Sequence, residues 1–485
     1  MARRPLALQL DDSSTLPIFA QIAAGIVGAI RAGRLAPGAP LPGSRALAAS
    51  LSVHRNTVIA AYRELESQGW ASGAQGRGTF VSRALPESRD SSSVAPGALA
   101  ARPHFPLAPA PPAPAVPSSI SRGLLSLQGG VPDLRLAPVD ELARAYRRAV
   151  RAPGGATLDY GSEYGHPRLR AALAAQVNEA RGLAATPEHV LVTRGSQMAF
   201  YLVARAVVEP GTVVAVEELG YQPAWEAFRA AGARLAPVPV DERGLRVDTL
   251  ERLVQAEPVR AVYVTPHHQY PTIVGMAPER RVALLALAKK HRFAIVEDDY
   301  DHEIHFHGRP LLPLASADRH GSVVYVATLS KTLAPGVRVG YVVAPRPLVD
   351  RMALLRRWVD RQGDPALEHA VAELLEDGVV QRHARRMRRV YEERRNHLVA
   401  ELEARLSSVV SAEAPSGGLA LWARVAPEVN VDEWTERALR EGVYVRPTRH
   451  FAFDGRTRPF LRLSYAPLTE REITEAVKRL RRALP

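Results

Sequence analysis

One segment limits how this chain can fold. Residues 94–117 read VAPGALAARPHFPLAPAPPAPAVP and contain eight prolines, eight alanines and a single charged residue. Proline fixes φ and lacks a backbone N–H, so this stretch can neither join a regular ladder nor bury a core, and we predict an extended, semi-rigid spacer. Together with the polar residues around it, the spacer forms a predicted linker over 84–124, which separates a head (1–83) from a body (125–485).

The composition of the chain excludes several kinds of chemistry. It has no cysteine, so disulfides, zinc–thiolate sites, iron–sulfur clusters and thiol nucleophiles are ruled out. No uninterrupted apolar run approaches the ~18–20 residues that cross a bilayer. Asp11 and Asp12 also interrupt the N-terminal segment before a signal-like stretch can form. We therefore expect a soluble, cytoplasmic protein, and its net charge of +13 permits a nucleic-acid partner.

The head has the pattern of three helices followed by a hairpin. The first helix carries an isoleucine every four residues, and Ser44 is a suitable N-cap for a short second helix. A tight turn then leads into RNTVIAAYRELESQGW, and two short strands around a glycine-rich turn follow in WASGAQGRGTFVS. The apolar positions that define the helices are Ile18, Ile22, Ile26 and Ile30, then Leu47, Ala48 and Leu51, then Val58, Tyr62 and Leu65.

This order of elements predicts a winged helix-turn-helix, whose second helix of the pair enters the major groove of DNA. The residues that would meet base edges or phosphates stand at the start of that helix: His54, Arg55, Asn56 and Thr57. Arg45 and the wing residue Arg77 suit phosphates or the minor groove. The head also carries nine arginines against four acidic residues, a net charge of +5.

The head resembles the GntR family of DNA-binding domains along its whole length, from PIFAQI through GRLAPGAPLPGSRALAASLSVHRNTVIAAYRELESQGW to GRGTFV. The resemblance implies that the same six residues, from Arg45 to Arg77, contact promoter DNA. A winged helix used only for protein contacts is the alternative interpretation of this domain.

The body alternates short β-branched runs with amphipathic helical stretches such as 278–292. This alternation predicts an α/β fold with a mostly parallel central sheet, in which ligands bind at the carboxyl ends of the strands. The predicted strands are 189–195, 212–219, 260–266, 293–300, 322–331 and 338–345.

Lys331 is the only lysine of four that follows a buried strand. Lys289 and Lys290 end a helix, and Lys478 lies among arginines in the C-terminal helix. A lysine that loses hydration at a strand end has a lower pKa and a more nucleophilic amine. From the residues alone, Lys331 is either a Schiff-base lysine or a member of an ordinary ion pair.

Other side chains favour a pyridoxal 5'-phosphate (PLP) site around Lys331. Asp298 is placed to face the ring nitrogen of the cofactor, Tyr300 its ring hydroxyl and Tyr221 its ring face. The start of the helix in RGSQMAF offers backbone N–H groups to a phosphate. The residues predicted to complete the phosphate cradle are Ser196, Gln197, Thr328, Ser330 and Arg338.

The body resembles fold-type I aminotransferases over 125–485, which implies a PLP-binding domain with a smaller C-terminal subdomain. SKTLAPGVRVGY resembles the lysine motif of that family and implies a Schiff base at Lys331. DYGSEYGHPRLRAAL implies that Tyr160 reaches the cofactor phosphate of a neighbouring subunit. FLRLSYA nominates Arg462 as the residue that binds the carboxylate of an effector or substrate, with Arg446 as a second candidate.

Two features of the body depart from simple expectation. In TPHHQYPTIVGM, Tyr270 stands where many aminotransferases have asparagine and Ile273 where they have glycine, which implies weakened transamination rather than loss of the cofactor. The pair His267–His268 and the segment DHEIHFH (301–307) invite a metal interpretation. Because His302 and His305 do not follow the metalloprotease helix pattern, we favour a polar rim near the cofactor and predict no metal site.

A GntR-type head, a long linker and an aminotransferase-like body together resemble the MocR/GabR subfamily of bacterial regulators, including its PdxR-like members. The resemblance implies a transcription factor that forms a head-to-tail homodimer and is nucleoid-associated when bound to DNA. Its signal is PLP alone or PLP with an amino acid or amine, and at most residual or half-transamination is expected. The alternative is a working PLP-dependent aminotransferase with an accessory DNA-binding domain.

Overall fold

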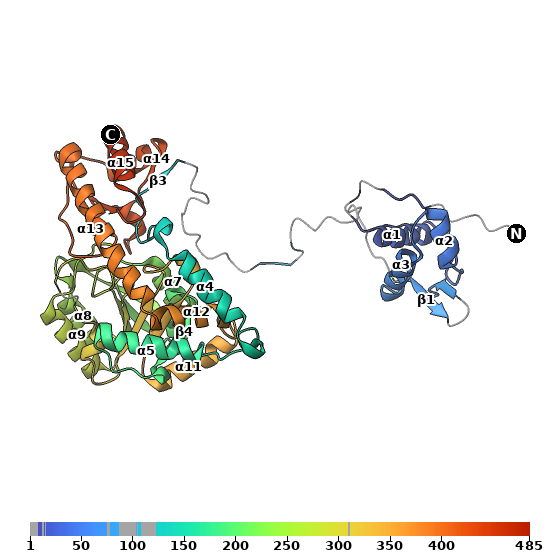
Figure 1. Ribbon diagram of the computed structural model, residues 1–485, viewed down its shortest axis with the longest axis horizontal. Helices are drawn as coiled ribbons and strands as arrows, with labels where there is room; N and C mark the ends of the chain where they lie inside the picture. The colour runs from blue at the N-terminus through green and yellow to red at the C-terminus, as the bar shows by residue number, and fades with distance from the viewer. Residues whose placement is uncertain are drawn as a thin grey trace. The chain divides into compact units, whose positions relative to one another are not determined.

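The computed structural model describes residues 8–11, 14, 16–74, 78–86, 103, 105–107, 123–308 and 311–485. The chain divides into two units, Met1–Val116 and Pro117–Pro485, coloured blue and teal to red in Figure 1. Most of the predicted linker lies outside the described residues, so its bounds at 84–124 remain a prediction. Among the residues that are described, no helix is long and apolar enough to cross a membrane.

The head unit is a winged helix-turn-helix built on a small apolar core. Val58, Tyr62 and Leu65 are buried in it, as the sequence predicts, whereas Ile18 is 44% exposed and lies outside the isoleucine stripe. Ile18 is the first residue of its helix, where the chain has not yet reached the core. The elements are α1 (Ile18–Arg31), α2 (Ser44–Leu51), α3 (Arg55–Ser67) and the antiparallel pair β1 (Ala71–Ala74) and β2 (Gly78–Val81).

The start of α2 differs from the prediction. Gly43 is the N-cap, and Ser44 is the first helical residue and makes no side-chain cap. Its Oγ instead accepts a hydrogen bond of 3.2 Å from Nε of Arg55, the first residue of α3. This contact links the two helices of the helix-turn-helix at the end where base reading is predicted.

The body is organised around a seven-stranded sheet of order β4-β12-β11-β10-β9-β5-β6. All six predicted strands are present in it, and only β12 runs antiparallel to its neighbours. The strands are β4 (Val190–Thr193), β5 (Val213–Glu217), β6 (Arg234–Val238), β9 (Val259–Val264), β10 (Ala294–Asp298), β11 (Val323–Thr328) and β12 (Gly340–Val343). This is the mostly parallel α/β sheet that the alternation of runs predicts.

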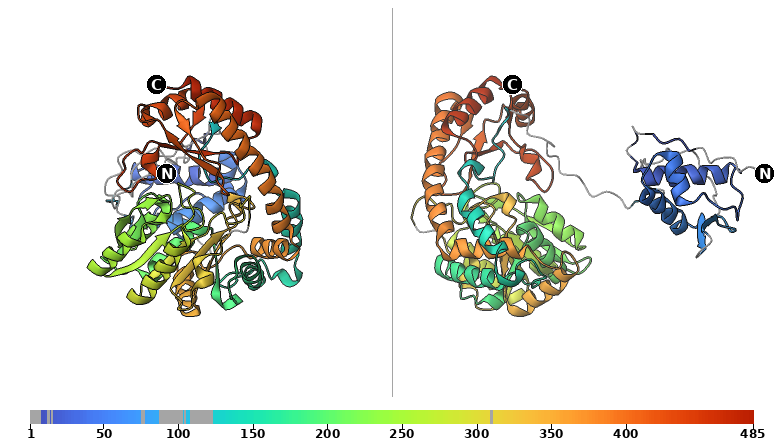
Figure 2. Two further views of the ribbon diagram at one scale, coloured as in Figure 1. Left: turned by 90° about the vertical axis from the view of Figure 1, so that its left-hand side faces the viewer. Right: turned by 45° about the vertical axis from the view of Figure 1, so that its right-hand side comes forward.

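Helices cover both faces of the sheet, which explains why its strands are apolar on both sides. On β10, Val296 packs with α6, α7 and α11, whereas its neighbour Ile295 packs with α8 and α9 on the opposite face. Figure 2 shows the helices around the strands of this lobe. The helices are α4 (Val139–Val150), α5 (Pro167–Arg181), α6 (Ser196–Val207), α7 (Gln222–Ala230), α8 (Val247–Ala256), α9 (Pro278–His291), α10 (Leu314–Ala317), α11 (Arg346–Arg357) and α12 (Pro365–Glu376).

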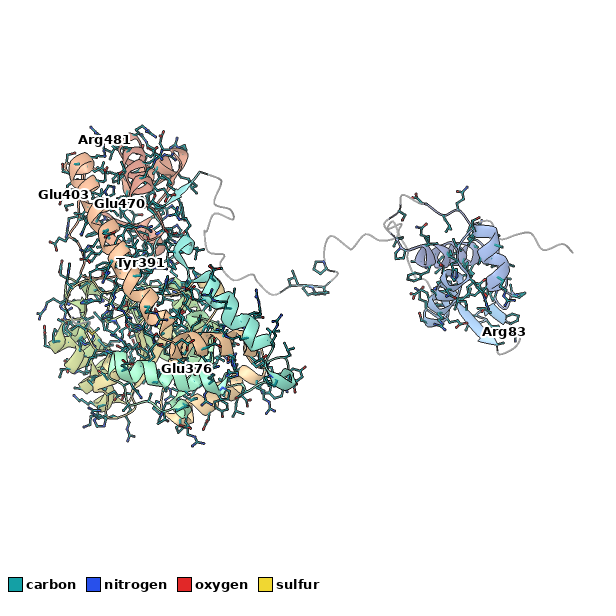
Figure 3. The ribbon with its side chains drawn as sticks, viewed as in Figure 1. Arg83, Glu376, Tyr391, Glu403, Glu470 and Arg481 are labelled. Atoms are coloured by element: carbon teal, nitrogen blue, oxygen red, sulfur yellow. The ribbon has the colours of Figure 1, made fainter. Side chains whose placement is uncertain are left out.

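A smaller C-terminal lobe follows the long helix α13 (Val379–Leu406), drawn in orange in Figure 1. Figure 3 labels Tyr391 along α13 and Glu403 near the end beside α15. The hydroxyl of Tyr391 accepts a hydrogen bond of 3.1 Å from the backbone N–H of Asp133. The lobe contains the sheet β13-β14-β16 (Val410–Ser411, Ala420–Val425, Phe460–Ser464), α14 (Val431–Arg440) and α15 (Glu470–Arg482).

Short elements complete the body. A parallel pair joins β3 near its start to β15 in the C-terminal lobe, and β7 and β8 form a hairpin. The strands are β3 (Leu125–Ser126), β7 (Val240–Asp241), β8 (Gly244–Leu245) and β15 (Val443–Tyr444), and the single-turn 3₁₀ helices are Leu134–Leu136, Pro153–Gly155, Pro187–His189, Pro335–Val337 and Thr448–His450.

Candidate functional site

A cavity of about 160 Å³ opens at the carboxyl ends of the parallel strands. Segments that follow β4, β5, β9, β10 and β11 converge there, as expected for a doubly wound sheet. Its lining includes nine of the residues predicted from the sequence: Ser196, Gln197, Tyr221, Asp298, Tyr300, Thr328, Ser330, Lys331 and Arg338. Tyr160 and Arg462 are not among its lining residues.

Lys331 supplies the primary amine of this cavity. It lies in the turn after β11 and is half-buried. Burial lowers the pKa of its ammonium group, and the Arg462 guanidinium lowers it further. Both effects favour the neutral amine, which is the nucleophilic form needed for attack on a carbonyl.

An acidic end of the cavity is formed by the last residue of β10. Oδ2 of Asp298 accepts a hydrogen bond of 2.8 Å from the Tyr263 hydroxyl, whereas Oδ1 is buried and has no partner among the described residues. Burial raises the pKa of Asp298 to about 7. The hydroxyl of Tyr300 is likewise buried and unpaired within the described part of the chain. An aromatic ring with an N–H and a neighbouring oxygen would satisfy both groups.

The opposite end of the cavity suits an anion. Helix α6 begins at Ser196 after Gly195, whose φ of 77° favours glycine. Ser196 and Gln197 of its first turn line the cavity, and the first turn of a helix offers backbone N–H groups to an anion. Arg338 lies beside this turn and donates a hydrogen bond of 2.7 Å to the carbonyl of Arg194. Thr328 Oγ1 lies 2.9 Å from Ser330 Oγ, so the two hydroxyls are held together. Together these groups have the chemistry to hold a phosphate.

Aromatic side chains form one wall of the cavity. Tyr221 contacts Tyr270 edge-to-face, with ring centroids 5.6 Å apart, and Tyr270 contacts Tyr300 in the same way at 6.1 Å. Tyr270, which replaces the asparagine of many aminotransferases, therefore lines the cavity without offering an amide. Ile273 has a φ of 65°, a conformation that glycine adopts more easily.

Arg462 lies next to this wall, on β16. It is 1% exposed, its guanidinium carbon lies 4.7 Å from the Tyr270 ring centroid, and none of its three nitrogens has a hydrogen-bond partner in the described residues. A buried, unpaired guanidinium is costly and fits a carboxylate ligand. Gly129 leaves room for it, since a Cβ there would lie 1.2 Å from one guanidinium nitrogen. Arg446, the second candidate, is half-buried and packs over Phe451.

Tyr160 lies apart from the cavity of its own chain. Its side chain is 74% exposed and its ring lies under the Arg361 guanidinium, 4.3 Å from the guanidinium carbon. An exposed phenol of this kind is available to a second copy of the chain.

The residues of the head that are predicted to read DNA lie mostly at the start of α3. His54 is the N-cap, and its Nδ1 accepts a hydrogen bond of 3.2 Å from the backbone N–H of Asn56. His54, Arg55 and Asn56 are exposed, as is Arg45 on α2, and Thr57 is half-buried. Arg77 lies outside the described residues, so its predicted role in the wing stays a prediction.

Sequence reasoning missed several residues of the cavity. Gly129, Gly130 and Pro335 line it, and Tyr263 orients Asp298 from the neighbouring strand. Gly129 and Gly130 are some 200 residues away from Lys331 in the chain, so no local pattern links them. The glycine pair just before Val131 was the available signal, and it resembles an ordinary loop.

These two sites define a class of protein: a DNA-binding head joined to a body of the aminotransferase type. Residues 19–81 match the bacterial regulatory proteins of the gntR family, and residues 124–480 match aminotransferase class I and II, a PLP-dependent family. The chain therefore belongs to the MocR-type transcriptional regulators, in which both families are fused.

Individual relatives agree with this assignment. The probable rhizopine catabolism regulatory protein MocR of Rhizobium meliloti is 32% identical over 98% of this chain and 95% of its own. The pyridoxine biosynthesis transcriptional regulator PdxR of Corynebacterium glutamicum is 31% identical over 82% and 81%. The structure of the α-aminoadipate aminotransferase LysN of Thermus thermophilus matches with a TM-score of 0.70 and 32% identity, over 75% of this chain and 92% of that one.

Proposed function

We propose that PLP, held as a Schiff base by Lys331, controls promoter binding by this regulator, alone or together with an amino-compound effector. The proposal rests on the groups that line the same cavity as Lys331. The amine of Lys331, the buried and unpaired Oδ1 of Asp298 and a set of groups suited to a phosphate all lie in that cavity. A cofactor with an aldehyde, a ring nitrogen and a phosphate meets all three groups. The same chain carries an exposed DNA-reading helix start.

Each group of the cavity would have a defined task. When bound, PLP supplies an electrophilic carbon and an electron sink. The amine of Lys331 would anchor it, Oδ1 of Asp298 would accept a hydrogen bond from the ring nitrogen, and Tyr300 would face the ring hydroxyl. The N-terminus of α6, Arg338 and the Thr328–Ser330 pair would hold the phosphate, and Tyr221 would cover the ring face; all of these residues line the cavity.

Arg462 supports an amino-acid effector over the cofactor acting alone. A regulator that senses only PLP has no need for a second buried cation beside the cofactor, yet Arg462 is buried without a partner in the described residues. A carboxylate would pair with its guanidinium through two hydrogen bonds. We infer that the effector carries an amine for the site of Lys331 and a carboxylate for Arg462.

Transmission to DNA requires two states of the body with different affinity for the ligand. We propose that two bodies pair head-to-tail, so that the exposed Tyr160 of each reaches the cofactor phosphate of the other. Ligand binding at this shared site would then change how the two bodies pair and how the two heads are presented to DNA.

The test measures binding of the full-length protein to DNA from upstream of its own gene and its neighbours. Apo and PLP-loaded protein are compared at one salt concentration, because phosphate contacts make affinity depend steeply on salt. A change in affinity or footprint on loading supports PLP as the signal, and a change only after an amino acid is added supports the effector. Specific binding that responds to neither overturns the proposal.

The second candidate is a catalytically active aminotransferase with an accessory DNA-binding domain. The specific observation in its favour is again Arg462, because a carboxylate site serves a substrate as well as an effector. Steady conversion of an amino donor and a 2-oxo acid, abolished by Lys331→Ala, would support this function. Failure to turn over while DNA binding responds to the amino compound favours the regulator.

A further inference from the structure

The two histidine segments noted in the sequence contribute three rings to one cluster. His267 and His268 follow β9, and His305 follows β10. One ring nitrogen of each lies within 4.8 Å of the others. His267 and His268 are 6% and 4% exposed, and His305 is half-buried. Such a group of imidazole nitrogens, from two loops, is an arrangement that can hold a metal ion.

The nitrogen atoms of this cluster are largely unused. Both nitrogens of His267 and Nδ1 of His305 are buried and lack a hydrogen-bond partner among the residues described. Buried polar atoms without a partner are rare, and each needs an explanation. A bound metal ion would give these nitrogens a partner.

His268 is oriented as a metal ligand usually is. Its Nδ1 lies 2.8 Å from Oδ1 of Asp301, and both side chains are buried. A carboxylate that holds the proton on Nδ1 fixes the lone pair on Nε2, which is the outer-shell arrangement common to zinc-bound histidines. Gly417 leaves the space next to Nε2 open, because a Cβ there would lie 2.7 Å from that atom.

We propose that His267, His268 and His305 bind a divalent ion of the zinc type. Three imidazoles suit zinc and leave a fourth tetrahedral position open. Ligand nitrogens of a tetrahedral zinc lie roughly 3.4 Å apart, so an ion would draw the rings together by up to about 1.4 Å.

The histidine predicted alongside His305 has a different role. His302 places Nδ1 3.3 Å from the Asp299 carbonyl and Nε2 3.1 Å from a Glu303 carboxylate oxygen, and it is not part of the cluster. The sequence predicts no metal because it weighs His302 with His305. The fold instead brings His305 to His267 and His268, more than 35 positions earlier.

The position of the cluster gives the ion a consequence for the cavity. The loop of His267 and His268 continues to Tyr270, and the segment of His305 comes from Asp298 and Tyr300. His305 also forms a β-bridge to Gly417 in the C-terminal lobe. One bound ion would therefore tie together two walls of the cavity and the lobe that carries Arg462.

The experiment counts metal in the full-length protein, prepared without a polyhistidine tag and stripped with a chelator. After dialysis against zinc or cobalt, we expect one ion per chain by mass spectrometry and the visible absorption of tetrahedral cobalt. His305→Asn should weaken zinc binding by at least about 100-fold. His307→Asn is the matched control, because His307 lies two residues away and its side chain is 65% exposed; it should bind as the wild type does.

Thermal unfolding separates metal binding from misfolding. Zinc should raise the Tm of the wild type and of His307→Asn, since a ligand of the folded state stabilises it, and should leave His305→Asn unchanged. If His305→Asn does not fold, His267→Gln replaces it in the same comparison. No bound ion in the wild type, or equal metal content in wild type and cluster variants, overturns the proposal.

Discussion

The head and the body place their functional residues in opposite ways. In the head, the residues predicted to read DNA, from Arg45 to Thr57, are close in sequence, lie on one helix–turn–helix and, except for the half-buried Thr57, are exposed. The body assembles its cavity from segments between Gly129 and Arg338, and several of those groups are buried and unpaired. In the head, the predicted functional residues lie on the surface and are not needed for the packing of the core. In the body, the functional residues are brought together by the packing of segments that are distant in the sequence.

This contrast has an energetic meaning. A side chain at the surface can change with little effect on stability, since exposed groups keep their water. A buried charged group has given up that water, and its substitution changes both function and stability. Substitutions of buried charged residues in the body should therefore alter folding as well as ligand binding, whereas substitutions of the exposed residues that are predicted to read DNA should alter DNA binding alone.

The largest effect is expected for Lys331→Ala. Without the amine, the Schiff base cannot form, and its visible absorption band on adding PLP should be absent rather than reduced. Any response of DNA binding to PLP should be lost with it, which titration by absorbance and by DNA binding will show.

The matched control for Lys331→Ala is Lys290→Ala, a lysine at the exposed end of α9. It should leave both the absorption band and the DNA response unchanged. A band that persists in Lys331→Ala but disappears in Lys290→Ala would place the reactive amine elsewhere.

Arg181→Met tests the buried interior of the body. Arg181 is 1% exposed, and its Nε and Nη2 donate hydrogen bonds of 3.0 and 2.7 Å to Oδ2 of Asp299. Removing one partner leaves an uncompensated buried charge, so we expect a loss of about 3–5 kcal/mol from the free energy of unfolding. Urea denaturation of the full chain, followed at the transition of the body, measures it.

An exposed ion pair in the same unit gives the comparison. Arg246 donates to Asp248 at 2.6 Å, but the two side chains are 45% and 51% exposed. Arg246→Met should cost only about 0–1 kcal/mol. If Arg181→Met and Arg246→Met lower the free energy of unfolding equally, burial does not decide how much an ion pair of the body contributes to stability.

The sequence predicts local features of both units and fails where distant segments meet. The six strands, the winged helix and the nine cavity residues that follow strand ends were all readable, because hydrophobic period and strand-end position are local properties. The unpaired state of Arg462 beside Tyr270, the space left by Gly129 and the cluster of His267, His268 and His305 depend on packing between segments 35 to 330 residues apart. The sequence predicts Ser44 as an N-cap because serine is common there, whereas in the structure Gly43 occupies that position.

Glu217→Gln tests how burial affects the pH dependence of the body. Burial raises the pKa of Glu217 to about 8, above its ordinary value near 4.5. A carboxyl with a raised pKa in the folded chain contributes stability below its unfolded pKa, and that contribution is lost as pH rises through the folded value. We expect Glu217→Gln to flatten the fall of stability between about pH 4.5 and 8, by up to about 1.4 kcal/mol per pH unit.

Thermal unfolding of apo protein across this pH range provides the measurement. Glu218→Gln, at the next position but half-buried, should keep the slope of the wild type. An unchanged slope in Glu217→Gln would mean that the carboxyl stays hydrated.

The smallest change in the free energy of unfolding is expected for substitutions in the head, which should nevertheless change DNA binding clearly. Asn56 is exposed at the start of α3, and its substitution by alanine should cost about 1–3 kcal/mol of binding to the operator but little binding to unrelated DNA. Arg45→Ala, by contrast, should weaken binding to all sequences and lower the slope of log affinity against log salt by about 1. Titrations of both variants on operator and random DNA at several salt concentrations separate the two roles. If Asn56→Ala lowers the free energy of unfolding of the head by as much as it lowers the free energy of operator binding, the contribution of Asn56 is structural. The head would then not differ from the body in keeping its functional residues separate from its stability.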